Sequence, residues 1–233
     1  MKKILALLMA ICIACLSFPL FGGAAANALH VAWAGKDSNN GLTSETPLQK
    51  PATAVEKLKT GGTVVVSGKA YIHNTQSLPQ TRDAVTFTSV YGGVDYKNTE
   101  PKNNPACAFK MASGATLTIS SEVIFDDIIL FQENGQNTLV VADGGRLEIR
   151  DNVICMSNHD YFWNIVVQKG GEAVISGGVF SSVTGEGGIT VGEKVKVLES
   201  GHSTAEAPTG NPTVAFHSYA GSDSNNGLTA QTP

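Results

Sequence analysis

Residues 143 to 151 gather side chains that could do chemistry. Arg146 and Arg150 are four positions apart in a strand-like run, so they face the same side of a strand. Asp143 and Asp151 flank that run. The two arginines are therefore the catalytic candidates, and the two aspartates are candidate Ca²⁺ ligands. The alternative is turn chemistry at both aspartates, because Asp-Gly-Gly and Asp-Asn are common turn sequences and no third acid shares the face.

A second candidate is the aromatic run Asn158-His159-Asp160-Tyr161-Phe162-Trp163-Asn164. Sugars stack on aromatic faces while their hydroxyl groups bond to polar side chains, so we expect Tyr161 and Trp163 to bind a ligand together with His159 and Asp160. The alternative is that Phe162 and Trp163 fold over an apolar edge and leave only Tyr161 in solvent.

A third candidate is the segment Asp37-Ser38-Asn39-Asn40-Gly41, in which Asp37 and Asn39 offer oxygen atoms to Ca²⁺. Its spacing is not that of an EF-hand, and an Asn-Gly turn explains the same residues. His73, His159 and His217 have no partner at metal-ligand spacing. We expect no cofactor, with Ca²⁺ as the one ion left open.

The charge of the chain gives no sign of a nucleic-acid partner. The formal net charge is −4, only 15% of the residues are charged, and there is no basic patch or Gly-rich phosphate loop. Hydrophobic residues make up 42%, which is enough for a core.

The first 28 residues have the form of a signal peptide. Two lysines precede an apolar run from Ile4 to Phe21, and Ala26-Asn27-Ala28 matches a cleavage site. The alternative is an uncleaved membrane anchor. After cleavage we expect no membrane contact, and only Cys107 and Cys155 would remain, which is too few for a disulfide framework.

An internal repeat sets the domain organisation. Residues 34 to 47 read AGKDSNNGLTSETP and residues 220 to 233 read AGSDSNNGLTAQTP, at an offset of 186 residues. We expect one domain over 29 to 202, a linker over 203 to 213 that is rich in small and polar residues, and a truncated second copy over 214 to 233. The chain would then belong to a longer protein with further tandem domains.

Between the two copies the pattern is all-β with one short helix. Pro51 and Gly61-Gly62 bound an amphipathic helix over 51 to 60. Short β runs between turns predict strands at 63 to 66, 84 to 90, 108 to 111, 116 to 119, 123 to 125, 139 to 141, 146 to 149, 165 to 167 and 173 to 175.

Three segments, beginning at Ala108, Thr138 and Asn164, align with each other at steps of 30 and 26 residues. Steps of this length indicate a β-solenoid, in which each coil buries the face of the one before it. The alignment predicts stacked interior rows at 117, 119, 147, 149, 173 and 175. It also places Arg146 beside Glu172, and it leaves the helix to cover the open end of the first coil.

The opening GKDSNNGLTSETPLQKPATAVEKL with GGTVVVSG resembles the start of bacterial extracellular proteins of the pectate-lyase-like superfamily. VTFTSVYGGVDY at 85 to 96 and VIFDDIIL at 123 to 130 are similar to β-helix domains of large surface proteins. The resemblance covers most of residues 30 to 200, and it implies a right-handed parallel β-helix with a short N-terminal capping helix. Active lyases of this superfamily carry clustered aspartates for Ca²⁺ and a Lys or Arg base, a pattern that no position here matches firmly.

Two functions remain. The preferred one is a non-catalytic, repeated β-helix module of a secreted or bacterial cell-surface protein, with a structural or adhesin role and contact with a polysaccharide or cell-wall glycan. The alternative is a polysaccharide lyase or hydrolase. The two differ in whether three acids and a Lys or Arg share one outer face, and we find no such set in the sequence.

Overall fold

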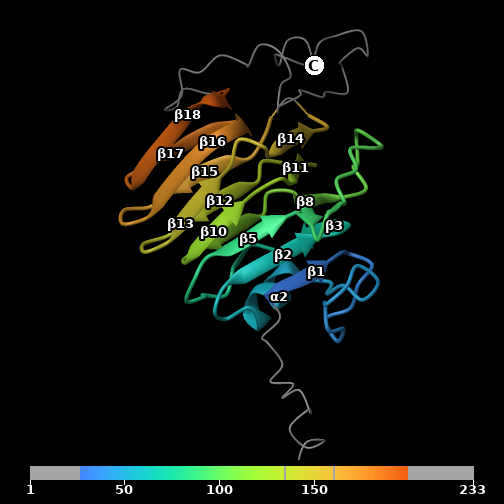
Figure 1. Ribbon diagram of the computed structural model, residues 1–233. Coiled ribbons are helices and arrows are strands. Elements are labelled where there is room, and N and C mark those ends of the chain that lie inside the picture. Colours follow the sequence, from blue (N-terminus) through green and yellow to red (C-terminus); the bar gives the residue numbers. More distant parts are fainter. Residues whose placement is uncertain (1–26, 134, 160, 199–233) are drawn as a thin grey trace, which may run out of the picture.

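The computed structural model describes residues 27 to 133, 135 to 159 and 161 to 198 (Figure 1). The predicted linker, the predicted second copy and all but the end of the predicted signal peptide lie outside these residues. The first strand begins at Ala28, the last residue of that predicted signal, and Asn27 accepts a hydrogen bond from the Thr63 N–H at 2.7 Å. Cleavage after Ala28 would leave Leu29 to Val31 as the strand.

The described residues are nearly all β, with three parallel sheets and one helix. Sheet A contains β1 (Ala28–Val31), β2 (Gly62–Val66), β5 (Val85–Thr88), β10 (Glu122–Phe125), β13 (Arg146–Ile149), β16 (Glu172–Phe180) and β18 (Gly188–Val197). Sheet B contains β3 (Lys69–Ile72), β8 (Ala108–Met111), β11 (Ile129–Gln132) and β14 (Ile154–Ser157). Sheet C contains β4 (Gln76–Ser77), β9 (Thr116–Ile119), β12 (Thr138–Val141), β15 (Asn164–Val167) and β17 (Ser182–Gly185).

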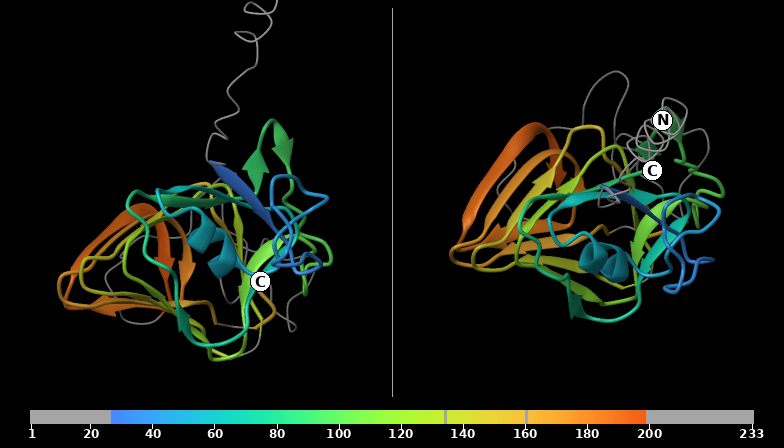
Figure 2. Two further views of the ribbon diagram at one scale, coloured as in Figure 1. Left: turned by 90° about the horizontal axis from the view of Figure 1, so that it is seen from below. Right: turned by 60° about the horizontal axis from the view of Figure 1, so that its bottom comes forward.

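The chain visits the three sheets in turn. From β2 to β15 the order A, B, C recurs four times, and it is interrupted only by a small antiparallel hairpin of β6 (Val90–Tyr91) and β7 (Val94–Asp95). Each strand pairs in parallel with the strand of the preceding circuit. Viewed from the β1 end, the sheets surround one interior (Figure 2).

Rows of apolar side chains fill that interior. In sheet A, Val64, Phe87, Phe125, Ile149 and Ile175 are successive partners across adjacent strands. Phe109 of sheet B meets Phe87 and Phe125 at ring-centroid distances of 5.4 Å each. Residues of all three sheets belong to one buried cluster, so burial between circuits is the main source of stability.

The predicted alignment is right for its second step and wrong for its first. Leu147 lies beside Ala173 and Ile149 beside Ile175, as predicted. Leu117, however, pairs with Leu139 in sheet C, whereas Leu147 pairs with Val123 in sheet A. Similar turns misled the alignment, because Ala112-Ser113-Gly114 joins sheet B to sheet C while Ala142-Asp143-Gly144 joins sheet C to sheet A.

Three of the four strands of sheet B escaped prediction. β11 follows β10 almost directly, and the corner between them is Asp126-Asp127-Ile128 instead of a Gly or Pro turn. Asp127 takes a left-handed backbone conformation with φ of 50°, which Asp tolerates better than most residues. A corner of this kind carries little turn signal in the sequence.

The single helix of the described residues, α2 (Pro51–Lys57), is shorter than predicted. Pro51 occupies its first turn, and Leu58 already leaves helical geometry before Gly61 reverses the chain with φ of 86°. Pro51, Ala54 and Val55 are buried. The helix lies across the end of the interior beside β1, β2 and β3, which is the covering position that the sequence predicted (Figure 2).

The two cysteines of the described chain are free and buried. Burial raises the pKa of Cys107 to about 11 and that of Cys155 to about 12. Both thiols are therefore protonated at neutral pH and behave as core side chains.

We expect Ile149→Asp to destabilise the protein by about 4 kcal/mol or more, because it places an unpaired charge between two circuits. Glu148→Ala, at the neighbouring outward position, should cost no more than about 1 kcal/mol. Thermal unfolding of both variants measures the difference. Equal midpoints would show that the assigned interior face is wrong.

His30 gives a second prediction. Its side chain is buried between Tyr91 and Tyr96, and burial lowers its pKa despite the opposing charge of Glu45. The unfolded chain therefore binds a proton more readily than the folded one, so this histidine costs stability as the pH falls below about 6.5. In His30→Phe, the loss of thermal stability between about pH 8 and about pH 5 should be smaller than in the wild type. His73→Gln, at an exposed histidine, is the control. An unchanged pH dependence in His30→Phe would contradict the lowered pKa of His30.

Candidate functional site: a cleft on sheet B

A cleft of about 300 Å³ lies on the outer face of sheet B. Its lining combines three aromatic rings, two ammonium groups, one amide and one carboxylate: Trp33, Tyr71, His73, Lys69, Lys110, Asn104 and Glu133. Lys69 and Tyr71 point outward because they alternate along β3 with the buried residues Ala70 and Ile72.

The three rings form one wall of the cleft. The His73 ring lies 4.5 Å from the Trp33 ring and 4.4 Å from the Tyr71 ring, measured between centroids. Pairing of β1 with β2 carries the chain to this position, and the Trp33 N–H donates to the Lys69 carbonyl at 2.6 Å. Trp33 is 46% exposed, so its ring is available to a ligand.

Lys110 forms the floor of the cleft. It is only 1% exposed, its Nζ lies 4.4 Å from the centre of the Phe131 ring, and it donates to Asn104 Oδ1. Burial and, to a smaller extent, the charge of Lys69 lower the pKa of Lys110 to about 8, although the charge of Glu133 acts in the opposite sense. The ammonium form therefore prevails at neutral pH and is lost as the pH rises through about 8.

Glu133 is engaged with Tyr71. Burial of the phenol raises the pKa of Tyr71, and the charge of Glu133 and a hydrogen bond to it raise that pKa further. Tyr71 consequently stays a neutral donor at physiological pH.

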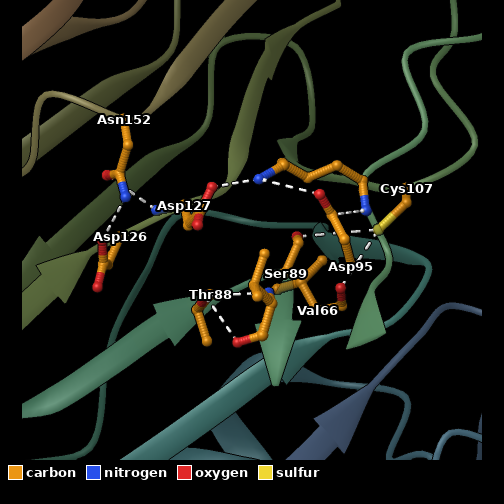
Figure 3. A network of polar contacts seen from close by, with 10 residues as sticks. Val66, Thr88, Ser89, Asp95, Cys107, Asp126, Asp127 and Asn152 are labelled. Atoms are coloured by element: carbon orange, nitrogen blue, oxygen red, sulfur yellow. Dashed lines mark hydrogen bonds and ion pairs between the residues drawn. The ribbon is translucent and has the colours of Figure 1, made fainter. Parts of the chain in front are cut away.

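A polar network holds the loop that supplies Asn104 (Figure 3). Lys97, at the start of the loop, contacts Asp127 and lies 3.4 Å from Asp95. Burial tends to lower the pKa of Lys97, but its bonds to the two aspartates outweigh burial and raise it. At the end of the loop, the Cys107 thiol donates to the Val66 carbonyl at 3.2 Å. Both ends of the loop are thus fastened to the sheets.

The predicted catalytic arginines lie elsewhere, on the outer face of sheet A, and both are paired. Arg146 contacts Glu122 at 2.6 Å and Glu148 at 3.1 Å, and its Nε lies 3.5 Å from Glu172, the predicted neighbour. Arg150 contacts Asp126 at 2.7 Å and Glu148 at 2.9 Å. These contacts form a ladder of charges in which carboxylates occupy both guanidinium groups.

The aromatic run is mostly core. Phe162 and Trp163 are each 3% exposed, and Trp163 packs 5.9 Å from Phe109. The prediction that Trp163 stacks on a ligand is therefore wrong, because its ring is buried. The alternative, in which Phe162 and Trp163 pack over an apolar edge, describes both residues. Tyr161 is half-buried and stacks on His159 at 5.2 Å, while its hydroxyl accepts a hydrogen bond from the Gly135 N–H. Asp160 lies outside the described residues.

The candidate calcium ligands do not converge. Asp37 accepts a hydrogen bond from the Lys50 N–H at 2.9 Å, and the Asn39 amide donates to the Pro47 carbonyl at 2.8 Å, so both belong to their own turn. Asp151 pairs with Lys194 at 2.6 Å, and Asp143 is exposed at the opposite end of β13. Within the ranges that the structure describes, no three His, Cys, Asp or Glu side chains are placed to hold a metal ion. The four candidate ligands are therefore not brought together at one site.

Sequence reasoning missed the cleft, although part of its signal was visible. Lys69, Tyr71 and His73 recur at every second position, which is the outward row of a strand. Trp33 and Asn104 come from loops far away in sequence, so only the fold brings them to that row.

No protein-family model, curated protein or solved structure matches this chain. No helix among the described residues is long and apolar enough to span a membrane. The geometry of the cleft is thus the basis on which a function can be argued.

Proposed function

We propose that the domain is a right-handed parallel β-helix module that binds a glycan in the cleft on sheet B and has no catalytic activity. The observation that carries this proposal is the wall of three aromatic rings beside polar side chains in an open cleft. The module would belong to a secreted or bacterial cell-surface protein with tandem copies.

The β-helix assignment rests on the path of the chain. Successive strands enter sheets A, B and C in turn, every pairing within these sheets is parallel, and one core joins them. This path of the chain supports a solenoid. Right-handed winding is proposed because connections between parallel strands strongly prefer that hand.

Glycan binding follows from the chemistry of the lining. A sugar ring offers C–H faces that pack against aromatic rings, and its hydroxyl groups pair with amide, phenol and carboxylate groups. Trp33 supplies an accessible face, while Tyr71, Asn104 and Glu133 supply polar atoms close to it.

The internal repeat supports a role for Trp33. When the repeat is extended upstream at the same offset, Trp33 corresponds to Tyr219, whereas His30 and Val31 correspond to Phe216 and His217. An aromatic ring is kept at the exposed position while the buried positions beside it change. Packing alone does not require an aromatic at a site that is 46% exposed, so ligand contact is the better explanation.

The alternative function, a polysaccharide lyase, is favoured by one observation. Lys110 has a pKa of about 8, which suits a general base at alkaline pH. Its Nζ, however, is directed to Asn104 and to the Phe131 ring, and acids that would hold Ca²⁺ are not gathered near it among the described residues. Binding without turnover therefore has the stronger support.

Affinity electrophoresis in gels containing pectin, hydroxyethyl cellulose or glycol chitin tests the binding. We expect at least one polymer to retard the protein, and Trp33→Ala to weaken that binding about five-fold, because one stacked ring contributes roughly 1 kcal/mol. Tyr161→Ala is the matched control, since it removes a tyrosine from the rival aromatic run, and its binding should be unchanged. Retardation that depends on Tyr161 and not on Trp33 would move the site to that run.

Catalysis is tested on the same polymers. With Ca²⁺ present at alkaline pH, we expect no rise in the ultraviolet absorbance of an unsaturated product from pectin. A steady rise that Lys110→Met abolishes would establish the lyase in place of the binding module. A rise abolished by Arg146→Ala or Arg150→Ala would place a lyase site on sheet A.

A further inference from the structure

We infer that the ligand of the cleft is a sugar ring that carries a negatively charged group, which Lys69 and Lys110 hold while the ring lies on the aromatic wall. This inference rests on the proposed glycan binding and adds the chemical class of the glycan. It starts from the charges of the lining, which contains two ammonium groups and only one carboxylate.

Several other cations of the described residues are paired with carboxylates. Arg146, Arg150, Lys97 and Lys194 each contact a carboxylate of the protein. Among the described residues, no carboxylate oxygen lies within salt-bridge distance of Lys69 or Lys110 in this cleft.

Lys110 is the stronger sign of an anionic ligand. An ammonium group that is 1% exposed has lost most of its hydration, and a neutral amide and an aromatic ring recover only part of that loss. Lys69 adds a like charge that opposes it further. An anion placed between the two ammonium groups would relieve both costs.

The register of the strands sets the two charges next to the rings. Tyr71 of β3 pairs with Lys110 of β8, and Lys69 precedes Tyr71 on the same outward row. A sugar ring that packs on Trp33 and Tyr71 would therefore lie in the same cleft as Lys69 and Lys110, within reach of an acidic substituent on that ring. Glu133 offsets the two charges only in part, because its charge raises the pKa of Lys110 while burial and Lys69 still hold that pKa at about 8.

Matched oligosaccharides test this inference on the purified chain by isothermal titration. The pairs are tetragalacturonate and its methyl ester, a hyaluronan tetrasaccharide and its methyl ester, and a sulfated carrageenan oligosaccharide and its desulfated form. Within each pair the ring is the same and the charge differs, and the three pairs distinguish carboxylate from sulfate. At about pH 7 we expect the charged member of at least one pair to bind about ten-fold more tightly than its neutral partner.

Substitutions then assign the preference to the two lysines. Lys69→Met and Lys110→Met should each remove most of the charge preference and leave binding of the neutral partner unchanged, whereas Trp33→Ala should weaken both. Lys169→Met, at an exposed turn remote in sequence from the cleft, is the control and should behave like the wild type. Because Lys110 is buried, Lys110→Arg gives a second variant that keeps the charge.

The pH dependence separates Lys110 from general surface charge. The preference should fall between about pH 7 and about pH 9.5, as the ammonium group of Lys110 loses its proton, and should persist in Lys110→Arg. Equal binding of charged and neutral partners by the wild type would overturn the inference and leave the proposed glycan binding intact. An equal loss of preference in Lys169→Met would also overturn it, and failure of every oligosaccharide to bind would overturn both.

Discussion

The fold depends on one repeated interaction, the packing of an inward apolar row against the same row of the next circuit. Phe87, Phe125, Ile149 and Ile175 show it in sheet A, where each side chain lies directly over its partner in the neighbouring strand. Parallel pairing without slippage keeps every second residue inside, so a shift by one position would bury polar side chains. The outward residues are released from that constraint, and they can differ from sheet to sheet.

Sheets A and B use this freedom differently. On sheet A the outward positions of β10, β13 and β16 bring Glu122, Arg146 and Glu172 side by side, so the charges satisfy one another and the surface has no cation left for a ligand among these strands. On sheet B the outward positions carry Tyr71 and Lys110, and no acid stands opposite the lysine on the paired strand. A charge ladder stabilises register, whereas an uncompensated ammonium beside exposed rings is suited to bind something else.

The sequence correctly predicted the helix and strands that have a local residue pattern. Pro51 marks the start of the helix, and the alternation in Arg146-Leu147-Glu148-Ile149 predicted both the strand and the neighbouring Glu172. It failed where the signal was ambiguous or absent: similar Gly turns occupy different corners, and the corner at Asp127 has no glycine. The cleft could be predicted only in part, because the row Lys69, Tyr71 and His73 is local, while Trp33 and Asn104 reach it through contacts of the folded chain.

The loop that carries Asn104 connects the polar network at the corner between sheets A and B with the cleft on sheet B. Its ends are fastened by Lys97 to Asp127 and by Cys107 to Val66, so the network at the corner between sheets A and B fixes the position of a residue on the outer face of sheet B (Figure 3). Asn104 then holds the Nζ of Lys110 at the floor of the cleft. Without that acceptor the ammonium group would be left with the Phe131 ring alone, and burial would favour its neutral form more strongly. The neutral side chain of Asn104 therefore helps to keep Lys110 charged, and the ion pair between Lys97 and Asp127 helps to position Asn104.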